Sequence, residues 1–418
     1  MSLSILDILF IYCLVSVWIL LFYNIILCYQ GYLYYNEVNK ESNSILKDMR
    51  DWPFVSIMIP AHNEEKVIEK TVLAMKKLDY PDENYEIMVI NDNSSDRTGE
   101  ILKGLKEKVS NLVIITTKPP EGGKGKSGAL NAGLKHVKGE FIVVYDADNT
   151  PERSALKYLV AAILKDSSLG AVIGKFRTRN KNVNILTKFI NIETLSFQWM
   201  AQAGRWKLFK VATIPGTNFI IRKSILDQLG GWDEKAVAED TELSIRIYES
   251  GYRIRFFPLA VTWEQEPEKW RVWLKQRTRW VRGNIYVIKK YFSLIFKLKK
   301  GIISFDILYF FSTYFLFLSS VIISDIIFIL GMLDIARISL TGPFSVLWIL
   351  AYLLFILEVS IALSLERGEN TLKNVLYVAL MYFTYCQAWI VLVIRSFYIN
   401  TKDWITGKKI TWYKTERF

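Results

Sequence analysis

The stretch FIVVYDAD at residues 141–148 places two aspartates directly after five apolar or aromatic residues. Its first part, Phe141 to Tyr145, is short, rich in β-branched residues and free of charge, which is typical of a strand that is buried on both faces. Asp146 and Asp148 fall where this strand ends. A buried strand that ends in paired carboxylates indicates an α/β domain with acidic groups at one edge of its sheet.

Strands and helices alternate through the region upstream of this stretch. Strands are predicted at residues 54–60, 85–90 and 112–116, and helices at 64–77, 97–108 and 128–137. This alternation predicts a doubly wound, mostly parallel sheet, in which ligands bind beyond the carboxyl ends of the strands. Asp92 follows a strand and therefore joins Asp146 and Asp148 at that edge. Asn63, just before the first helix, is predicted to cap it.

The three aspartates allow two interpretations. Aspartate commonly initiates turns and caps helices, which would account for Asp92 alone. Three carboxylates at two strand ends are harder to explain in this way. An Asp-x-Asp sequence at a strand end suits a hard divalent cation, which prefers oxygen ligands and often bridges a diphosphate. The sequence therefore favours a cation site at Asp146 and Asp148.

A glycine-rich stretch, EGGKGKS at residues 121–127, superficially resembles a nucleotide-binding P-loop. That motif requires glycine at the position that Pro120 occupies, so the P-loop interpretation is rejected. Two alternatives remain. The backbone donors of the stretch and Lys126 could contact phosphates, or the stretch could be a solvated loop.

Apolar blocks flank the central domain on both sides. The 418-residue chain is 51% hydrophobic, and four blocks, at residues 5–29, 307–331, 343–365 and 372–399, are long enough to cross a bilayer. The formal net charge of +12 does not indicate nucleic-acid binding, because many of the basic residues border these blocks. The positive-inside rule predicts a multi-pass protein of the cell membrane, with the central domain in the cytoplasm.

The C-terminus conflicts with a simple count of crossings. Four crossings would leave the tail outside, whereas its basic residues favour the inside: Lys402, Lys408, Lys409, Lys414 and Arg417. A broken or re-entrant apolar block would resolve this conflict. Asp325 and Glu358 lie within apolar blocks, where they either form hydrogen bonds between helices or line a polar path.

Cysteine and histidine contribute little to the expected chemistry. Cys13, Cys28 and Cys386 all lie in apolar blocks, and none belongs to a C-x-x-C pair. The chain has two histidines, which are too few for most histidine-based metal sites. Neither a disulfide framework nor a zinc site is expected.

Polar motifs continue beyond the first half of the domain. The turn at residues 215–218 leads into a predicted strand at 219–223, and Glu239-Asp240 opens a predicted helix at 241–250. An acidic pair at a helix N-terminus is favoured by the helix dipole, and it could also supply a general base. Residues 268–300 interleave tryptophan with lysine and arginine, which indicates an amphipathic helix at a membrane interface.

In this order, the motifs resemble those of family 2 membrane glycosyltransferases with the GT-A fold. This group includes the poly-N-acetylglucosamine, chitin-oligosaccharide, hyaluronan and bacterial cellulose synthases. The matching segments are PAHNE at 60–64, Asp92, GKSGALN at 125–131, Asp146-Ala147-Asp148, Glu239-Asp240 and QRTRW at 276–280, with a softer match of WYKTER at 412–417. The resemblance covers residues 54–284 closely. Each motif is weak alone, but their order and spacing are specific.

The resemblance implies roles for twelve residues. The donor nucleotide would contact Ala61, Asn63, Glu64, Asp92, Lys126 and Asp146, and a metal ion, Mg²⁺ or Mn²⁺, would bind Asp148 and Asp146. Asp240 with Glu239 would be catalytic, and Gln276, Arg279 and Trp280 would hold the acceptor and diphosphate. Asp240 would take the proton from the acceptor hydroxyl. Ala238 stands where relatives have threonine, which leaves acceptor handling and linkage open.

The implied function is processive, inverting polymerisation of a nucleotide-activated sugar, with a UDP-sugar as the expected donor. The product would be a β-linked exopolysaccharide that the protein exports. Two alternatives are a non-processive enzyme that adds one sugar to a lipid, and a catalytically silent subunit of a synthase complex. The expected organisation is an N-terminal membrane helix at 1–30, a GT-A domain at 50–264, interfacial helices at 265–300, membrane helices at 304–400 and a basic tail at 401–418. An accessory membrane subunit is a further expected partner.

Overall fold

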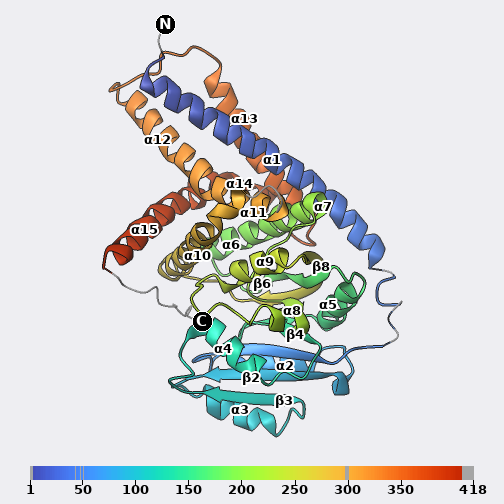
Figure 1. The fold of residues 1–418 in the computed structure, drawn as a ribbon. Coiled ribbons are helices and arrows are strands. Elements are labelled where there is room, and N and C mark those ends of the chain that lie inside the picture. Colours follow the sequence, from blue (N-terminus) through green and yellow to red (C-terminus); the bar gives the residue numbers. More distant parts are fainter. Residues whose placement is uncertain (1–2, 43, 48, 50, 297–300, 407–418) are drawn as a thin grey trace.

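The computed structural model describes residues 3–296, except 43, 48 and 50, together with residues 301–406. A helical layer, built from both ends of the chain, lies over a domain that contains the sheet (Figure 1). Most of the predicted basic tail, including the segment at 412–417, lies outside the described residues.

The sheet has eight strands in the order β3-β2-β1-β4-β7-β6-β8-β5. Their bounds are β1 Val55–Ala61, β2 Tyr85–Asp92, β3 Leu112–Thr117, β4 Phe141–Val144, β5 Thr150–Pro151, β6 Leu169–Thr178, β7 Phe219–Arg222 and β8 Arg253–Glu264. Strands β3, β2, β1 and β4 are parallel, β7 runs antiparallel to β4 and β6, and β6 and β8 are again parallel. The predicted α/β fold with a mostly parallel sheet is confirmed.

Every residue of β2 and β4 is buried, because helices cover both faces of the sheet. The helices of the domain are α2 Ile68–Lys76, η1 Asp82–Asn84, α3 Thr98–Lys106, α4 Gly125–Leu134, α5 Ala155–Leu164, α6 Ile185–Ser196, η2 Phe197–Gly204, α7 Arg205–Phe209, α8 Lys223–Gln228, α9 Glu239–Glu249, α10 Trp270–Tyr291 and η3 Phe292–Phe296. The segments α6, η2 and α7 form one continuous helical run, in which η2 is a π-helix.

The predicted cap at Asn63 is wrong. Helix α2 begins at Ile68, four residues later than predicted, and its N-cap residue is Val67. Asn63 has a φ of +55°, and its side-chain oxygen accepts hydrogen bonds from the backbone N–H groups of Ser95 and Asp96. The side chain of Asn63 therefore holds the loop after β2 instead of a helix end, a contact that sequence spacing did not indicate.

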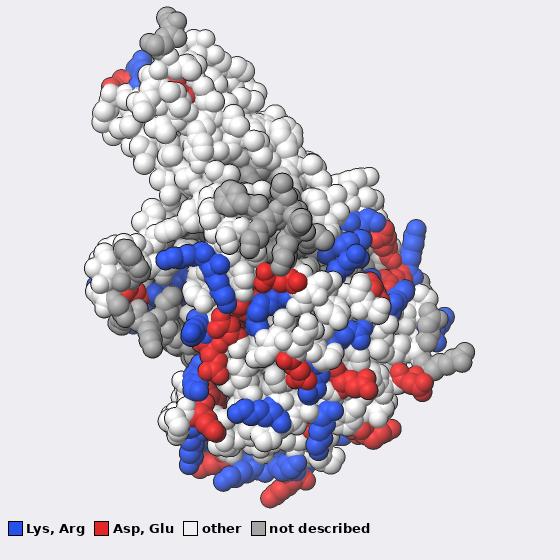
Figure 2. Space-filling view, viewed as in Figure 1, with Lys and Arg blue, Asp and Glu red and all other residues white. Residues whose placement is uncertain are grey.

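The apolar helices are α1 Ile5–Glu41, α11 Gly301–Phe311, η5 Ser312–Phe317, α12 Leu318–Met332, α13 Phe344–Ser364, α14 Leu372–Phe383 and α15 Tyr385–Thr406. Within the described residues, four helical stretches are long and apolar enough to cross a membrane: Ile5–Glu41, Phe315–Met332, Phe344–Ser364 and Leu372–Asp403. They match the four predicted blocks. The face seen in Figure 2 is almost free of charged residues over this layer and densely charged over the domain with the sheet.

The last apolar block is broken. Helix α14 ends at Phe383 and α15 begins at Tyr385, with Thr384 between them at φ −125° and ψ −78°. Helix α15 packs along α10, the predicted amphipathic helix. A broken apolar block was the feature proposed to reconcile four apolar blocks with a basic tail on the inside of the membrane. The side of the membrane on which the tail lies stays a prediction.

Helix α1 is both a candidate membrane span and part of the folded domain. Its C-terminal half crosses η2 so closely that a Cβ on Gly31 would lie 2.1 Å from the carbonyl oxygen of Trp199. On the other side of the crossing, a Cβ on Gly204 would lie 2.3 Å from the carbonyl oxygen of Leu27. Further along α1, Tyr34 donates a hydrogen bond to the carbonyl oxygen of Phe256 at 2.5 Å. Two glycines thus allow backbone-to-backbone packing of α1 on the domain.

Replacing Gly31 with alanine should loosen this crossing. We expect Gly31→Ala to lower the free energy of unfolding by about 2 kcal/mol, because the added methyl group must displace a backbone carbonyl. Gly104→Ala is the matched control, since nothing lies within 4 Å of a Cβ there and the residue is inside helix α3. The control should be neutral or stabilising by up to about 1 kcal/mol. Denaturant unfolding in detergent tests both, and equal stability of the two variants would contradict the close crossing.

Candidate active site

A cavity of about 940 Å³ lies at the carboxyl ends of β1, β2 and β4 and extends to the apolar helices. Eleven of the twelve predicted site residues line it: Ala61, Glu64, Asp92, Lys126, Asp146, Asp148, Glu239, Asp240, Gln276, Arg279 and Trp280. They come from three strand ends, the glycine-rich stretch, the N-terminus of α9 and helix α10. Asn63, which holds the loop after β2, is not among the lining residues. The sequence motifs thus converge on one cavity.

The strand ends β1 and β2 form one side of the cavity. Asp92 accepts hydrogen bonds from the hydroxyl of Thr117 and the backbone N–H of Gly123, both at 2.7 Å. This carboxylate therefore fixes the glycine-rich stretch against the sheet, and Gly123 to Lys126 line the cavity. His62 also lines the cavity, and its Nδ1 lies 2.7 Å from the carbonyl oxygen of Asp92. His62 was not among the predicted site residues, although it lies within the matching segment at 60–64.

Lys126 connects three segments that meet at the centre of the cavity. Its Nζ donates to Oδ1 of Asp146 and to the carbonyl oxygen of Gly216, both at 2.6 Å, and lies 3.8 Å from Oε1 of Glu239. Burial alone would lower the pKa of Lys126, but the charges of Asp146, Glu239 and Asp240 raise it overall. The ammonium group therefore stays charged.

Glu239, which is buried, and Asp240, which is partly buried, form a carboxyl pair at the N-terminus of α9. Burial, followed by repulsion from Asp240, raises the pKa of Glu239 to about 7, and burial also raises the pKa of Asp240. The two groups therefore titrate as a pair. A Cβ on Gly216, which has a φ of +87°, would lie 2.8 Å from Oδ2 of Asp240. Glycine is required there both by the backbone and by the closeness of the carboxylate.

Ala238 precedes this pair and lies against helix α10. A Cβ on Gly283 would lie 2.7 Å from the Cβ of Ala238. Two small residues therefore allow α10 to approach the start of α9. This contact gives a packing reason for alanine at a position where the related motif has threonine.

The donor atoms at the end of β4 fit a divalent cation. Asp148 is 4% exposed and lines the cavity beside Asp146, so both carboxylates belong to the same wall. No cluster of three or more histidine, cysteine or acidic ligands occurs in the described part of the chain. Two protein carboxylates nevertheless suit Mg²⁺ or Mn²⁺, because such ions usually complete their coordination with water and substrate phosphate oxygens.

Helix α10 forms the opposite side of the cavity, and Arg277 organises it. The guanidinium of Arg277 lies over the Trp280 ring at 3.9 Å from its centroid and donates to Oε2 of Glu193 at 2.8 Å and to Oε1 of Gln276 at 2.9 Å. Arg277 is 1% exposed, whereas the Trp280 side chain is 40% exposed. A buried cation thus holds an accessible aromatic ring. Arg277 was not predicted, although it lies inside the QRTRW segment.

Glu193 links this side of the cavity to helix α15. The hydroxyl of Tyr385 donates to Oε2 of Glu193 at 2.8 Å, and Trp273 Nε1 donates to the hydroxyl of Tyr385 at 2.9 Å. Several residues of the apolar helices also line the cavity: Tyr309, Thr313, Phe317, Leu318, Cys386 and Trp389. Their sequence context is uniformly apolar and gave no signal for a site.

This arrangement agrees with the family that the sequence matches. Residues 53–283 match the family described as "Glycosyltransferase like family 2". The chain belongs to glycosyltransferase family 2, and it is a transferase with the GT-A fold. The mannosyltransferase PcManGT from Pyrobaculum calidifontis, solved in complex with GDP-Man and Mn²⁺, superposes over 91% of this chain and 99% of its own, with a TM-score of 0.54 and 19% sequence identity. At this identity the likeness concerns the fold alone.

Two curated relatives share more of the sequence. The "Probable glycosyltransferase YdaM" of Bacillus subtilis (strain 168) is 53% identical over 410 residues, which cover 98% of each chain. The "Poly-beta-1,6-N-acetyl-D-glucosamine synthase" of Staphylococcus aureus (strain COL) is 32% identical over 246 residues, 59% of this chain and 58% of that one. The chain is thus related to a polysaccharide synthase over about three-fifths of its length.

The carboxyl pair of Glu239 and Asp240 should make stability depend on pH. The pKa of Glu239 is about 7 in the folded protein, against 4.5 for an ordinary glutamate. Between these two pH values the folded protein therefore binds a proton at Glu239 more tightly than the unfolded chain does. The free energy of unfolding must therefore fall as the pH rises through this range. We expect Glu239→Gln to be more stable than the original protein at about pH 8, by on the order of 3 kcal/mol, and the gain to fade towards about pH 5.

Glu234 offers a matched control for this measurement. Its side chain is 42% exposed, and it pairs with Lys124, which lines the cavity. Glu234→Gln should change the free energy of unfolding by less than about 0.5 kcal/mol at either pH. Urea unfolding at both pH values, without donor or metal, provides the comparison. A pH-independent effect of Glu239→Gln would contradict the raised pKa.

Proposed function

We propose that the protein is a processive, inverting glycosyltransferase of the cell membrane that polymerises a nucleotide-activated sugar, with UDP-sugars as the favoured donors. The β-linked product would be an exopolysaccharide that the protein exports. The observation that carries this proposal is the single cavity that joins Asp146 and Asp148, the Glu239-Asp240 pair, Trp280 and the apolar helices. The relation to a poly-β-1,6-N-acetylglucosamine synthase supports the polymer as product.

The donor would lie against the strand ends. Its nucleoside would contact Ala61, Glu64 and Asp92, which line the cavity beside the glycine-rich stretch. Lys126 is fixed between Asp146 and Gly216, so its charge is available to the diphosphate without a change in its position. A Mg²⁺ or Mn²⁺ ion held by Asp148 and Asp146 would offset negative charge on the leaving diphosphate.

Asp240 would act as the base on the acceptor hydroxyl. Burial raises the pKa of its carboxyl group, which makes it a stronger proton acceptor once it is ionised. The backbone N–H of Thr241 donates to its Oδ1 at 2.7 Å, which orients the carboxylate. Removal of the proton would let the hydroxyl oxygen attack the anomeric carbon opposite the diphosphate, and an α-linked donor would give a β-linked product.

The acceptor would be held by helix α10. The accessible ring of Trp280, fixed by Arg277, offers a flat surface on which a terminal sugar can stack. Gln276 and Arg279 line the same part of the cavity, and Arg279 would contact the acceptor or the diphosphate. The growing chain would then leave past the apolar helices that border the cavity.

The proposed placement puts the domain with the sheet in the cytoplasm, where nucleotide sugars are made. The separation of charged and apolar regions in Figure 2 supports a bilayer around the helical layer. An accessory membrane subunit remains a proposed partner. A second function, transfer of one sugar to a lipid acceptor, is favoured by the apolar side chains of Phe317, Leu318 and Trp389 in the cavity wall.

The base can be tested together with the size of the product. The protein should transfer sugar from at least one member of a panel of UDP-sugars supplied with Mg²⁺ and Mn²⁺, and Asp240→Asn should lower the rate at least about 100-fold while donor binding persists. Asp227→Asn, at an exposed position of helix α8, is the control and should keep the original rate. A ladder of polymers supports processive synthesis, a single glycolipid supports the lipid acceptor, and near-normal transfer by Asp240→Asn would exclude its role as the base.

Chelation tests the proposed cation. Transfer should stop in excess EDTA and return with Mg²⁺ or Mn²⁺, and Asp148→Asn should raise the metal concentration needed for half-maximal rate. The thermal unfolding temperature of the protein without donor should not change with EDTA, because the proposed ion depends on substrate oxygens for part of its coordination. Full activity of the original protein in EDTA would remove the cation from the proposal.

A further inference from the structure

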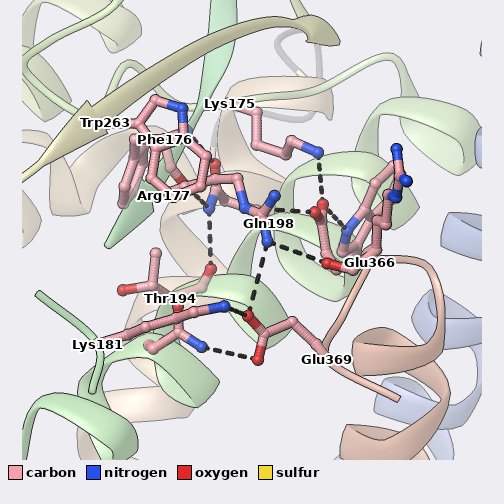
Figure 3. A network of polar contacts seen from close by, with 12 residues as sticks. Lys175, Phe176, Arg177, Lys181, Thr194, Gln198, Trp263, Glu366 and Glu369 are labelled. Atoms are coloured by element: carbon pink, nitrogen blue, oxygen red, sulfur yellow. Dashed lines mark hydrogen bonds and ion pairs between the residues drawn. The ribbon is translucent and has the colours of Figure 1, made fainter. Parts of the chain in front are cut away.

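The turn between helices α13 and α14 inserts two acidic side chains into the domain with the sheet (Figure 3). Glu366 and Glu369 lie in this turn, and the side chain of each is only 2% exposed. Both helices are candidate membrane spans, or parts of them. Buried carboxylates need opposite charges and hydrogen-bond donors, and here the domain supplies them from β6, the loop after β6, α6 and η2.

Glu366 binds the edge of the domain through three side chains. Its Oε1 accepts from Lys175 Nζ at 2.5 Å and from Trp199 Nε1 at 2.8 Å. Its Oε2 lies 3.7 Å from Nε of Arg177. One carboxylate therefore holds residues on both sides of Phe176 in strand β6.

Glu369 completes the network. It pairs with Lys181 and lies 3.6 Å from the guanidinium of Arg177, while its Oε2 accepts from Asn191 Nδ2 at 3.2 Å. Arg177 therefore lies between both carboxylates, and its guanidinium also stacks on the Trp263 ring at 4.7 Å from the centroid. Each side chain that flanks Phe176 is fixed by the turn.

The backbone of Phe176 is fixed independently. Gln198 in η2 accepts a hydrogen bond from the Phe176 N–H at 2.8 Å and donates one to its carbonyl oxygen at 2.9 Å. A β-bulge lies just before Phe176, at Gly174, where the side chain of Asn218 leaves no room for a Cβ. Bulges commonly redirect a side chain next to a site. Phe176 lines the cavity together with Thr194 and Phe197 of the neighbouring helical run.

We infer that Phe176 contacts the acceptor sugar, and that Glu366 and Glu369 are positioning residues through which the turn between α13 and α14 sets the place of this ring. The inference rests on the proposed transfer to a sugar acceptor. The ring of Phe176 in the cavity wall offers an apolar face for a pyranose, as Trp280 does on α10. The same contact couples two apolar helices to the acceptor side of the cavity.

A simple anchor between the two regions would not need this arrangement. Arg255 and Glu41 form such an anchor between β8 and the end of α1, with a distance of 2.6 Å, and neither residue lines the cavity. By contrast, the network of Glu366 and Glu369 converges on the two residues that flank a cavity residue. Glu41→Gln is therefore a matched control for the loss of a largely buried carboxylate between α1 and the domain.

The test uses the full chain in nanodiscs, with the UDP-sugar that the panel identifies and a β-linked oligosaccharide of the same sugar as acceptor. Phe176→Ala should raise the acceptor KM about tenfold, and Phe176→Tyr, which keeps the ring, should stay within about threefold. Glu366→Gln and Glu369→Gln should each raise the acceptor KM about fivefold. For all four variants, the donor KM and the hydrolysis of donor without acceptor should remain within about twofold, and Glu41→Gln should leave the acceptor KM unchanged.

A double variant separates positioning from general stability. If Glu366 acts through Phe176, then Glu366→Gln should add nothing to the acceptor KM once Phe176→Ala is present. If Glu366→Gln does not fold, the double variant Lys175→Met/Glu366→Gln, which removes both buried charges, is used in place of Glu366→Gln in the comparison with Phe176→Ala.

Three results overturn the inference: an unchanged acceptor KM in Phe176→Ala, equal changes in donor and acceptor KM, or additive effects in the double variant. The first two leave the proposed function intact, because the original protein still transfers sugar. Absence of transfer by the original protein from any UDP-sugar would instead overturn the proposed function and this inference with it.

Discussion

The ammonium group of Lys126 is the contact on which the rest of the cavity depends. It joins the end of β4, the turn before β7 and the N-terminus of α9 through Asp146, Gly216 and Glu239. These segments lie far apart in the sequence, and a buried cation is tolerated only when its partners are in place. Gly216 must be glycine, because a Cβ at this position would collide with the carboxylate of Asp240. One charge therefore fixes the relative positions of the carboxylates proposed to bind the metal and to accept the proton.

The helical layer is tied to this centre at several levels. The close crossing of Gly31 and Gly204 joins α1 to η2, and Tyr385 of α15 reaches Glu193, which in turn holds Arg277 under Trp280. Apolar helices thus contribute to the cavity instead of serving only as an anchor. A purely structural membrane anchor could be joined by a linker, but hydrogen bonds to residues of the cavity wall require a fixed relation between the two regions. This fixed relation is the physical basis for linking the proposed sugar transfer to the proposed export of its product.

The sequence was sufficient for β1, β2, β3, β4 and β7 and for the polar residues at the centre of the cavity, because both depend on local patterns, whereas β5, β6 and β8 were not predicted. Buried β-branched runs marked β1, β2 and β4, and parallel strands necessarily bring Asp92, Asp146 and Asp148 to one edge. The failures depended on tertiary contacts. Asn63 looked like a helix cap, but it binds a loop more than thirty positions away in the chain (Ser95 and Asp96). Arg277 is indistinguishable by sequence from other basic residues of an amphipathic helix. The cavity residues of α11, η5, α12 and α15 lie in apolar segments, where the sequence does not distinguish them from residues that face lipid or other helices.

Charge balance explains why the carboxyl pair and the proposed cation belong together. Asp146, Asp148, Glu239 and Asp240 line a cavity in which Lys126 and Arg279 supply the nearby positive charge. Full ionisation would leave an excess of negative charge before any donor entered, and a nucleoside diphosphate would add to it. Two responses reduce this cost in a buried site: one carboxyl group retains a proton, or a cation enters with the diphosphate. The pKa of Glu239, raised to about 7, represents the first response in the protein alone. Entry of a divalent cation with the donor would provide the second, and by offsetting the shared negative charge it would let Asp240 remain ionised and available to the acceptor hydroxyl.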